Sequence, residues 1–111
     1  MGVQKDAGEL LLFFYDELVN NNKNSVGTQE VINTTKWESN RINLAYNYLN
    51  DMGVLKGGGG LGNIQGVQIF YIMRLLPEGI NIVENQPQFK RNFGFEVNLG
   101  LLKFSWGTSE K

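Results

Sequence analysis

The stretch from residue 38 to residue 76, ESNRINLAYNYLNDMGVLKGGGGLGNIQGVQIFYIMRLL, changes its hydrophobic period once, and that change indicates the fold. Before Gly53 the apolar residues Ile42, Ala45, Tyr46 and Leu49 recur at helical spacing, and Gly53 is typical of the residue that follows a helix. After Gly53 the pattern predicts a short strand at 54–56, a flexible glycine-rich tip at 57–63 and a returning strand at 67–76, rich in β-branched and aromatic residues. The stretch therefore predicts a long helix followed by a β-hairpin.

Two further helices are expected before this stretch. Apolar residues at helical spacing predict the first at 7–22, and the asparagine-rich residues 20–24 end it. Thr28 is a suitable N-cap for a short helix at 29–33, with a break at Thr34 and Thr35. The long helix begins at Glu38, or at Lys36 if Thr35 and Glu38 form a capping box; the sequence alone does not choose between these starts.

The C-terminal third divides into a fourth helix and a β extension. Pro77 is suited to the first turn of a helix at 78–85, with Ile80 and Val83 facing inward, and Pro87 is expected to end it. Apolar residues then alternate with polar ones on both sides of Gly100, which predicts a C-terminal β-hairpin or two short strands. We expect one α+β domain over residues 1–111, with a core at 7–85, a β extension at 89–106 and a frayed tail at 107–111.

Composition limits the chemistry that the chain can perform. The 111 residues are 41% hydrophobic and 19% charged, as in a globular protein, and they include no cysteine and no histidine. Disulfides, zinc–thiolate sites, thiol nucleophiles and histidine bases are therefore excluded. We find no catalytic motif, so the chain is predicted not to be an enzyme and to need no cofactor or metal. There is no signal peptide and no apolar run of the ~18 residues that span a bilayer, so we expect no membrane association and a cytoplasmic location.

The order of predicted elements resembles the winged helix-turn-helix superfamily of DNA-binding domains. The resemblance covers roughly residues 7–85. It rests on the entry into the second helix at 26–32, on the long helix that ends in Leu49 and then Gly53, and on the step from hairpin to last helix at 75–80. Family members often carry Thr-x-x-Gly at that last step, whereas this chain has Leu or Pro at the Thr position. The resemblance implies a winged-helix domain with three helices, a β-hairpin wing and a short fourth helix.

The resemblance also implies that the long helix reads DNA in the major groove. Asparagine can pair with adenine, so base readout is assigned to Asn40, Asn43 and Asn47, which lie opposite the apolar face of the helix. Contacts to phosphate are assigned to Lys36, Arg41 and Lys56, and Ser39, which flanks the N-terminal half of the helix, is also expected to bind DNA. The alternative is that these residues form an ordinary solvated face.

Two other features have more than one interpretation. Gly57, Gly59 and Gly62 match the dinucleotide-binding fingerprint, but a strand signal follows them instead of a helix, so a flexible wing tip is the better interpretation. The aromatic residues from Phe89 onward either pack within the chain or form a homodimer interface, and stacking on single-stranded nucleic acid is a third possibility.

We therefore expect a DNA-binding protein, a small transcriptional regulator that acts as a homodimer through its C-terminal aromatic segment. The rival hypothesis is a winged-helix module that binds another protein and has lost nucleic-acid binding. A net charge of −1 and a pI of about 5.4 favour the rival, because duplex binding depends on clustered lysine and arginine. A positive surface over the long helix and the hairpin would favour DNA, and a neutral one would favour a protein partner.

Overall fold

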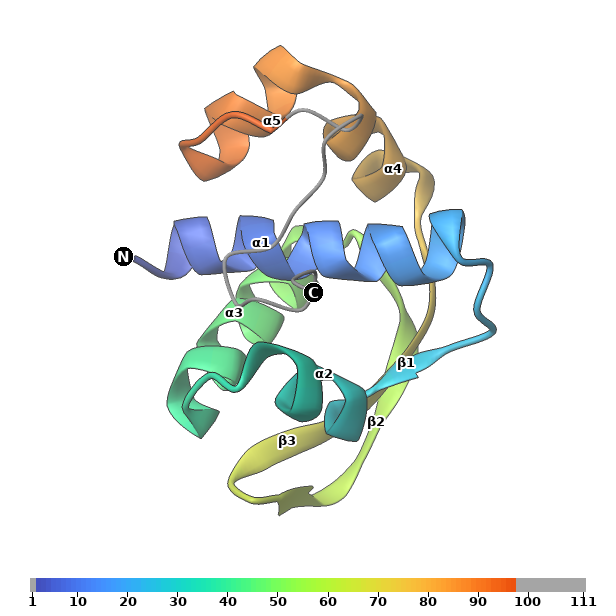
Figure 1. The fold of residues 1–111 in the computed structure, drawn as a ribbon, viewed down its shortest axis with the longest axis vertical. Helices are drawn as coiled ribbons and strands as arrows, with labels where there is room; N and C mark the ends of the chain where they lie inside the picture. The colour runs from blue at the N-terminus through green and yellow to red at the C-terminus, as the bar shows by residue number, and fades with distance from the viewer. Residues whose placement is uncertain (1, 98–111) are drawn as a thin grey trace.

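Helix α1 (Val3–Tyr15) is the central element of the computed structural model, which describes residues 2–97 (Figure 1). Every residue from Asp6 to Tyr15 is buried, and a helix that is apolar around most of its circumference is stable only when other elements surround it. Helix α3 packs on one side of α1, and helices α4 and α5 pack on the other. The helix begins four residues before the predicted start, and a π-helical turn, η1 (Asp16–Asn20), ends it in the asparagine-rich segment as expected.

Helix α2 (Thr28–Thr35) is longer than predicted. The break expected at Thr34 and Thr35 is wrong, because the helix continues through both residues and ends only at Lys36, which has a left-handed φ of 57°. Thr28 is not the N-cap. Its hydroxyl instead lies against β3, where it accepts a hydrogen bond of 2.7 Å from the backbone N–H of Phe70. A buried tertiary contact thus replaces the predicted local cap.

Helix α3 (Ser39–Met52) matches the later of the two predicted starts. Glu38 is its N-cap residue, so the start at Lys36 is wrong. The hydroxyl of Thr35 donates to the carbonyl of Val31 instead of capping α3. Gly53 ends the helix with a φ of 75°, as the sequence predicted.

Three antiparallel strands form a sheet in the order β1-β3-β2. Strand β3 (Val67–Leu75) lies in the centre and agrees with the prediction, and β2 (Leu55–Ile64) is its partner in the hairpin. Strand β1 (Val26–Gly27) was not predicted, because two residues are too few to show a strand period. The element order α1-β1-α2-α3-β2-β3 is compatible with a winged-helix arrangement.

The predicted flexible tip at 57–63 is wrong in position. These residues belong to β2, and the backbone of Gly57 to Gly59 pairs with β3 from Ile72 to Phe70. The turn lies at Gln65 and Gly66, whose φ angles of 53° and 88° are both positive, as a two-residue type I′ turn requires. A Cβ atom at Gly57 would collide with the carbonyl oxygen of Tyr71, so close approach of the two strands requires glycine there.

Helix α4 (Pro77–Glu84) begins at Pro77 as predicted, and Val83 is buried while Ile80 is partly buried. The chain beyond it differs from the prediction. Pro87 does not end the helical structure but lies in the first turn of α5 (Gln86–Phe93), where proline is well tolerated.

The predicted β extension is therefore wrong over residues 89–93, and residues 94–97 form no strand. Phe89 and Phe93 are four residues apart, which places both rings on one helical face in the core, where they are 0% and 1% exposed. The alternation that began at Phe93 suggested a strand, but helical spacing fits the same rings. The remaining predicted strands at 98–106 and the predicted tail at 107–111 lie outside the described residues.

Candidate binding surface

The seven residues predicted to bind DNA lie along α3, at its approach from α2 and at the base of the hairpin. Three of them are exposed to solvent: Lys36, Asn40 and Lys56. The other four are only half-exposed: Ser39, Arg41, Asn43 and Asn47. The set therefore does not form one continuous exposed face, because some of its members make contacts inside the protein.

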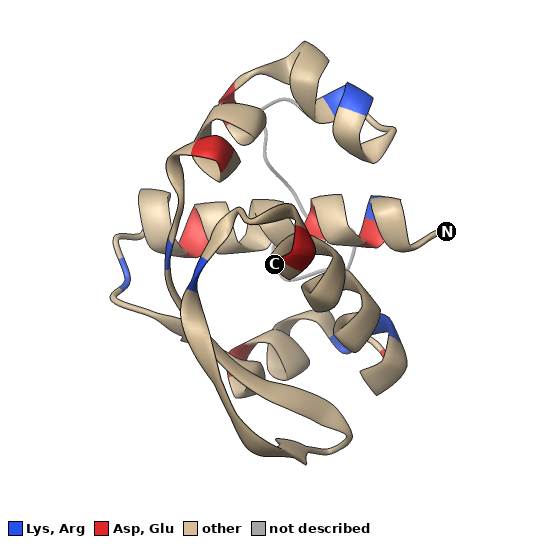
Figure 2. Ribbon diagram, turned by 180° about the vertical axis from the view of Figure 1, so that it is seen from behind, with Lys and Arg blue, Asp and Glu red and all other residues tan. Residues whose placement is uncertain are grey.

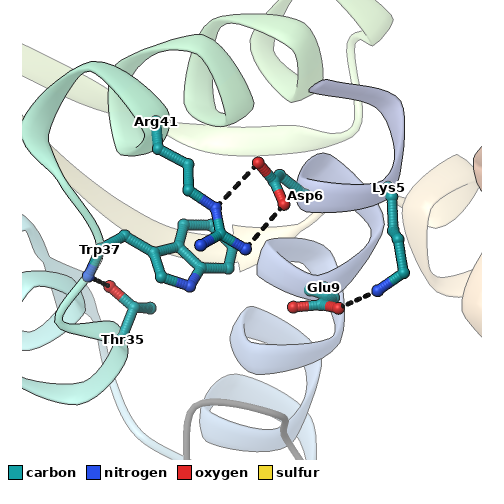
Figure 3. A network of polar contacts seen from close by, with 6 residues as sticks. All are labelled: Lys5, Asp6, Glu9, Thr35, Trp37 and Arg41. Carbon is teal, nitrogen blue, oxygen red and sulfur yellow. Dashed lines mark hydrogen bonds and ion pairs between the residues drawn. The ribbon is translucent and has the colours of Figure 1, made fainter. Parts of the chain in front are cut away.

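Arg41 is engaged by helix α1. Its guanidinium donates from Nε and Nη2 to the two carboxylate oxygens of Asp6, each at 2.9 Å, and its Cζ lies 4.0 Å from the centre of the Trp37 ring (Figure 3). Asp6 is only 7% exposed, so this bidentate ion pair is partly shielded from water. The positive charge of Arg41, which the sequence assigned to a phosphate contact, is thus largely neutralised within the protein.

The same network joins three helices through polar contacts (Figure 3). Lys5 and Glu9, one turn apart on α1, form an ion pair. Thr35, at the end of α2, accepts a hydrogen bond of 3.2 Å from the backbone N–H of Trp37. The Lys5–Glu9 pair lies within α1, whereas the Arg41–Asp6 pair links α3 to α1 and the Thr35–Trp37 bond fixes the connection from α2 to α3. We therefore assign these contacts to holding the helices in place.

Asn43 is engaged by the hairpin. Its side-chain amide donates to the carbonyl of Gly66 at 3.0 Å, and its side-chain oxygen accepts from the backbone N–H of Gln68 at 2.9 Å. A Cβ atom at Gly66 would lie 3.0 Å from the hydroxyl of Ser39, so the turn also sits directly against the start of α3. Asn43 and Ser39 thus hold the hairpin turn on the helix, a role that the sequence did not indicate.

The hairpin itself is uncharged. No lysine, arginine, aspartate or glutamate occurs from residue 57 to residue 73, and Figure 2 shows the hairpin free of charged residues beyond its base. Large apolar side chains on it are exposed: Leu61 is 97% exposed, and Tyr71 and Met73 are each 47% exposed. On α3, Leu44 adds another apolar side chain that is 44% exposed. An apolar, uncharged hairpin thus projects from the helical body.

Two cations stand at the base of the hairpin. Lys56 on β2 and Arg74 on β3 are direct partners in the antiparallel ladder, and both are exposed. Sequence reasoning selected Lys56 but missed Arg74, because the pairing of the two strands depends on an irregularity between Lys56 and Gly57 that has no sequence signature. Arg74 also lines a groove of about 330 Å³ formed with apolar side chains: Leu18, Val19, Leu75, Pro77 and Ile80.

One titratable pair, a buried tyrosine and an exposed glutamate, joins α1 to α4. The hydroxyl of Tyr15 donates to the carboxylate of Glu84 at 2.6 Å, and burial together with this carboxylate raises the pKa of Tyr15 to about 12. Tyr15 is only 7% exposed and does not line the groove beside Arg74, so we assign the pair to the packing of α4 on α1.

Residues 2–97 contain no group of three or more acidic side chains that could hold a metal ion. In the same residues, no helix has both the length and the apolar character needed to cross a membrane. A scan against protein-family models, a search of curated proteins and a search of solved structures each find no match.

Proposed function

We propose that the chain is a non-enzymatic binding domain of the winged-helix type and that its partner is another protein. The observation that supports this proposal most directly is the uncharged hairpin with exposed Leu61, Tyr71 and Met73. The centres of protein–protein interfaces are depleted of charge and enriched in aromatic residues and methionine. Contiguous exposed apolar side chains are also a common mark of interaction sites.

The distribution of charge over α3 supports a protein partner as well. Duplex DNA is bound through several lysine and arginine contacts to phosphate. Of the basic residues assigned to that role, Arg41 is paired with Asp6, which leaves Lys36 and Lys56. Acidic Glu38 and Asp51 flank the same helix and would oppose phosphate. The surface is therefore closer to neutral than to positive.

Site-specific photo-crosslinking tests this proposal. A photoreactive amino acid at position 61, on the hairpin, is compared with the same amino acid at position 81, which is exposed on α4. We expect defined protein adducts from position 61 in the cells that make the protein, and none from position 81. Equal labelling at both positions, or no adducts, would contradict a protein partner at the hairpin.

A second candidate function, sequence-specific DNA binding by a small transcriptional regulator, is favoured by the arrangement of α2, α3 and the hairpin. Lys36, Asn40 and Lys56 are exposed on that side, and Asn47 is half-exposed. Selection from a random duplex pool at low salt tests it. Enrichment of one sequence, with Lys56→Ala weakening binding to all sequences alike, would favour DNA. No enrichment and no salt-dependent retention would exclude it.

The predicted homodimer is now a narrower proposal. Phe89 and Phe93 belong to the core, and Phe95 packs edge-on against Phe89 with ring centres 5.2 Å apart, so the described part of the aromatic segment contacts its own chain. The proposal that the aromatic segment forms the dimer interface therefore rests on its residues beyond 97. Sedimentation equilibrium of the full chain and of a chain ending at residue 97 tests this: a dimer that only the full chain forms supports it, and a monomer in both cases excludes it.

A further inference from the structure

Four basic side chains among residues 2–97 form no ion pair with an acid: Lys36, Lys56, Arg74 and Arg91. The other four in these residues form ion pairs with acids: Lys5, Lys23, Arg41 and Lys90. Of the unpaired residues, Lys56 and Arg74 stand directly opposite each other on β2 and β3. Like charges at opposite positions of a ladder are destabilising, since the two side chains project from the same face. The fold thus tolerates a local repulsion that an anion would relieve.

An apolar groove lies directly beside Arg74, the partner of Lys56 in the ladder. Arg74 forms one wall of it, and apolar residues from η1, the end of β3 and the start of α4 form the rest. Its volume of about 330 Å³ is at the lower end of the range for ligand sites, enough for one or two apolar side chains. Val19 on its rim is 40% exposed.

We propose that Lys56, Arg74 and this groove, together the hairpin-base site, bind a peptide segment of another protein in which an acidic residue is adjacent to apolar ones. The acidic side chain would pair with Arg74 and Lys56, and a neighbouring apolar side chain would enter the groove beside Val19. A guanidinium is well suited to a carboxylate because it can donate two parallel hydrogen bonds. This inference rests on the proposed function, since it assumes a protein partner.

The groove decides between a peptide and a nucleic acid. The phosphates of duplex DNA could contact the two cations, but its bases are stacked inside the helix, so it has no free apolar group to place between Leu18, Val19 and Ile80. Binding that uses both parts of the site requires a ligand with a negative charge and an aliphatic or aromatic group a few ångströms apart. Peptides with Asp or Glu next to Leu, Ile or Phe meet this requirement.

A random dodecapeptide library displayed on phage, selected on the full chain, provides the probe. We expect enriched peptides to carry Asp or Glu beside a large apolar residue. One enriched peptide, made with a fluorescent label, is then titrated by anisotropy. The double variant Lys56→Gln and Arg74→Gln should bind it at least tenfold more weakly and with less salt dependence. Val19→Ser should also bind it more weakly.

Arg91→Gln is the matched control, because Arg91 is an exposed arginine of α5 with no ion pair among residues 2–97. This variant should bind the peptide with the same affinity as the native chain. The double variant removes a repulsion, so its thermal midpoint should equal or exceed that of the native chain, and loss of binding cannot then be ascribed to unfolding.

Two results would overturn the hairpin-base site: no enrichment of acidic-apolar peptides, or equal binding by the double variant. If enriched peptides bind the double variant normally and position 61 still gives protein adducts, the site fails but the proposed function stands. If instead no peptide is enriched, position 61 gives no adducts and duplex DNA binding depends on Lys56 and Arg74, both fail.

Discussion

Helix α1 and the β2–β3 hairpin differ in almost every property that burial controls. The helix is buried from Asp6 to Tyr15 and contributes leucine and phenylalanine side chains to the core. Half of the residues of strand β2 are glycine, and most of its residues from Lys56 to Asn63 are exposed. Buried apolar area is the main source of stability in a small domain. The comparison teaches that α1 contributes most to the stability of the fold, whereas much of the hairpin is exposed surface.

Side chains of β3 cover part of the β2 backbone, where glycines provide no side chains of their own. The Tyr71 ring of β3 lies across Gly58, where a Cβ atom would be 2.7 Å from the tyrosine hydroxyl. Glycine weakens a strand because it loses more backbone entropy on folding than other residues do. Packing of the Tyr71 ring over the glycine backbone offsets part of that cost, although Tyr71 itself remains 47% exposed.

The largest expected effect tests the α1 half of this comparison. Phe14 is fully buried in α1, so Phe14→Ala should lower the free energy of unfolding by about 3–5 kcal/mol through lost burial and a cavity. Leu61→Ala on the hairpin is the control, and it should change stability by less than about 0.5 kcal/mol because Leu61 is 97% exposed. Urea unfolding measures both. Similar losses in the two variants would refute the division of roles.

The contact between α1 and α4 gives the next effect, which depends on pH. Because the folded pKa of Tyr15 is raised to about 12 from its ordinary value of 10.0, its contribution to stability is complete below pH 10 and is lost as pH rises through 12. A shift of this size corresponds to at most roughly 3 kcal/mol at the upper limit. Tyr15→Phe should flatten the stability profile between pH 10 and 12.

Lys23 complicates the same pH range, since hydrogen bonds to Glu17 and Glu30 also raise its pKa. Its contribution is likewise lost at high pH. Lys23→Met therefore serves as the control variant, and in it the part of the pH dependence that belongs to Tyr15 should persist. If Tyr15→Phe shows the same dependence of stability on pH as the native chain, the hydrogen bond from Tyr15 to Glu84 does not stabilise the fold.

A smaller effect is expected from the glycine strand. Gly57→Ala should cost about 1–3 kcal/mol, because the new methyl group meets backbone atoms of β3 that cannot move aside. Gly60→Ala is the matched control in the same strand: its nearest contact, at 3.1 Å, is the Ile69 side chain, which can shift. Amide exchange along β3 should accelerate in the first variant, with α1 remaining protected. Faster exchange in α1 as well would show that the two regions unfold together.

The smallest expected effect concerns the link between α3 and the hairpin. Asn43→Ala removes two neutral hydrogen bonds to the turn and should cost about 1–2 kcal/mol. Asn40→Ala, at an exposed position of the same helix, should cost less than about 0.5 kcal/mol. Exchange of the Gln68 amide, whose N–H donates to the Asn43 side chain, measures the link. Unchanged exchange in Asn43→Ala would show that the turn is held by other contacts.

Sequence patterns predicted the elements that have a strong local signal. The amphipathic period of α3, Gly53 at its end and Pro77 at the start of α4 each reflect the physics of a single helix, and each is confirmed. The same reasoning placed the turn at 57–63, because a run of glycines is a stronger local signal than Gln65 and Gly66. The close approach of Gly57 to β3 became visible only with both strands in place.

The candidate site was less predictable for a related reason. Helical spacing correctly placed Arg41 and Asn43 away from the buried stripe of α3. It does not indicate which residues of other elements these two side chains contact. Asp6 is 35 positions from Arg41 in the chain, and Gly66 is 23 positions from Asn43. Such partners come from tertiary packing, and no local pattern encodes them. Arg74 was missed because its significance depends on its opposite residue.

The two hydrogen bonds between Asn43 and the hairpin also limit how tightly a ligand can bind through the Asn43 side chain. A ligand that takes the Asn43 amide must first release Gly66 and Gln68, and that release costs about 1–2 kcal/mol. Since each 1.4 kcal/mol is a factor of ten in a dissociation constant, such a ligand would bind about five- to thirtyfold more weakly than one that leaves Asn43 in place. Partners that contact the outside of the hairpin avoid this penalty, and they can bind while the turn stays fixed on α3.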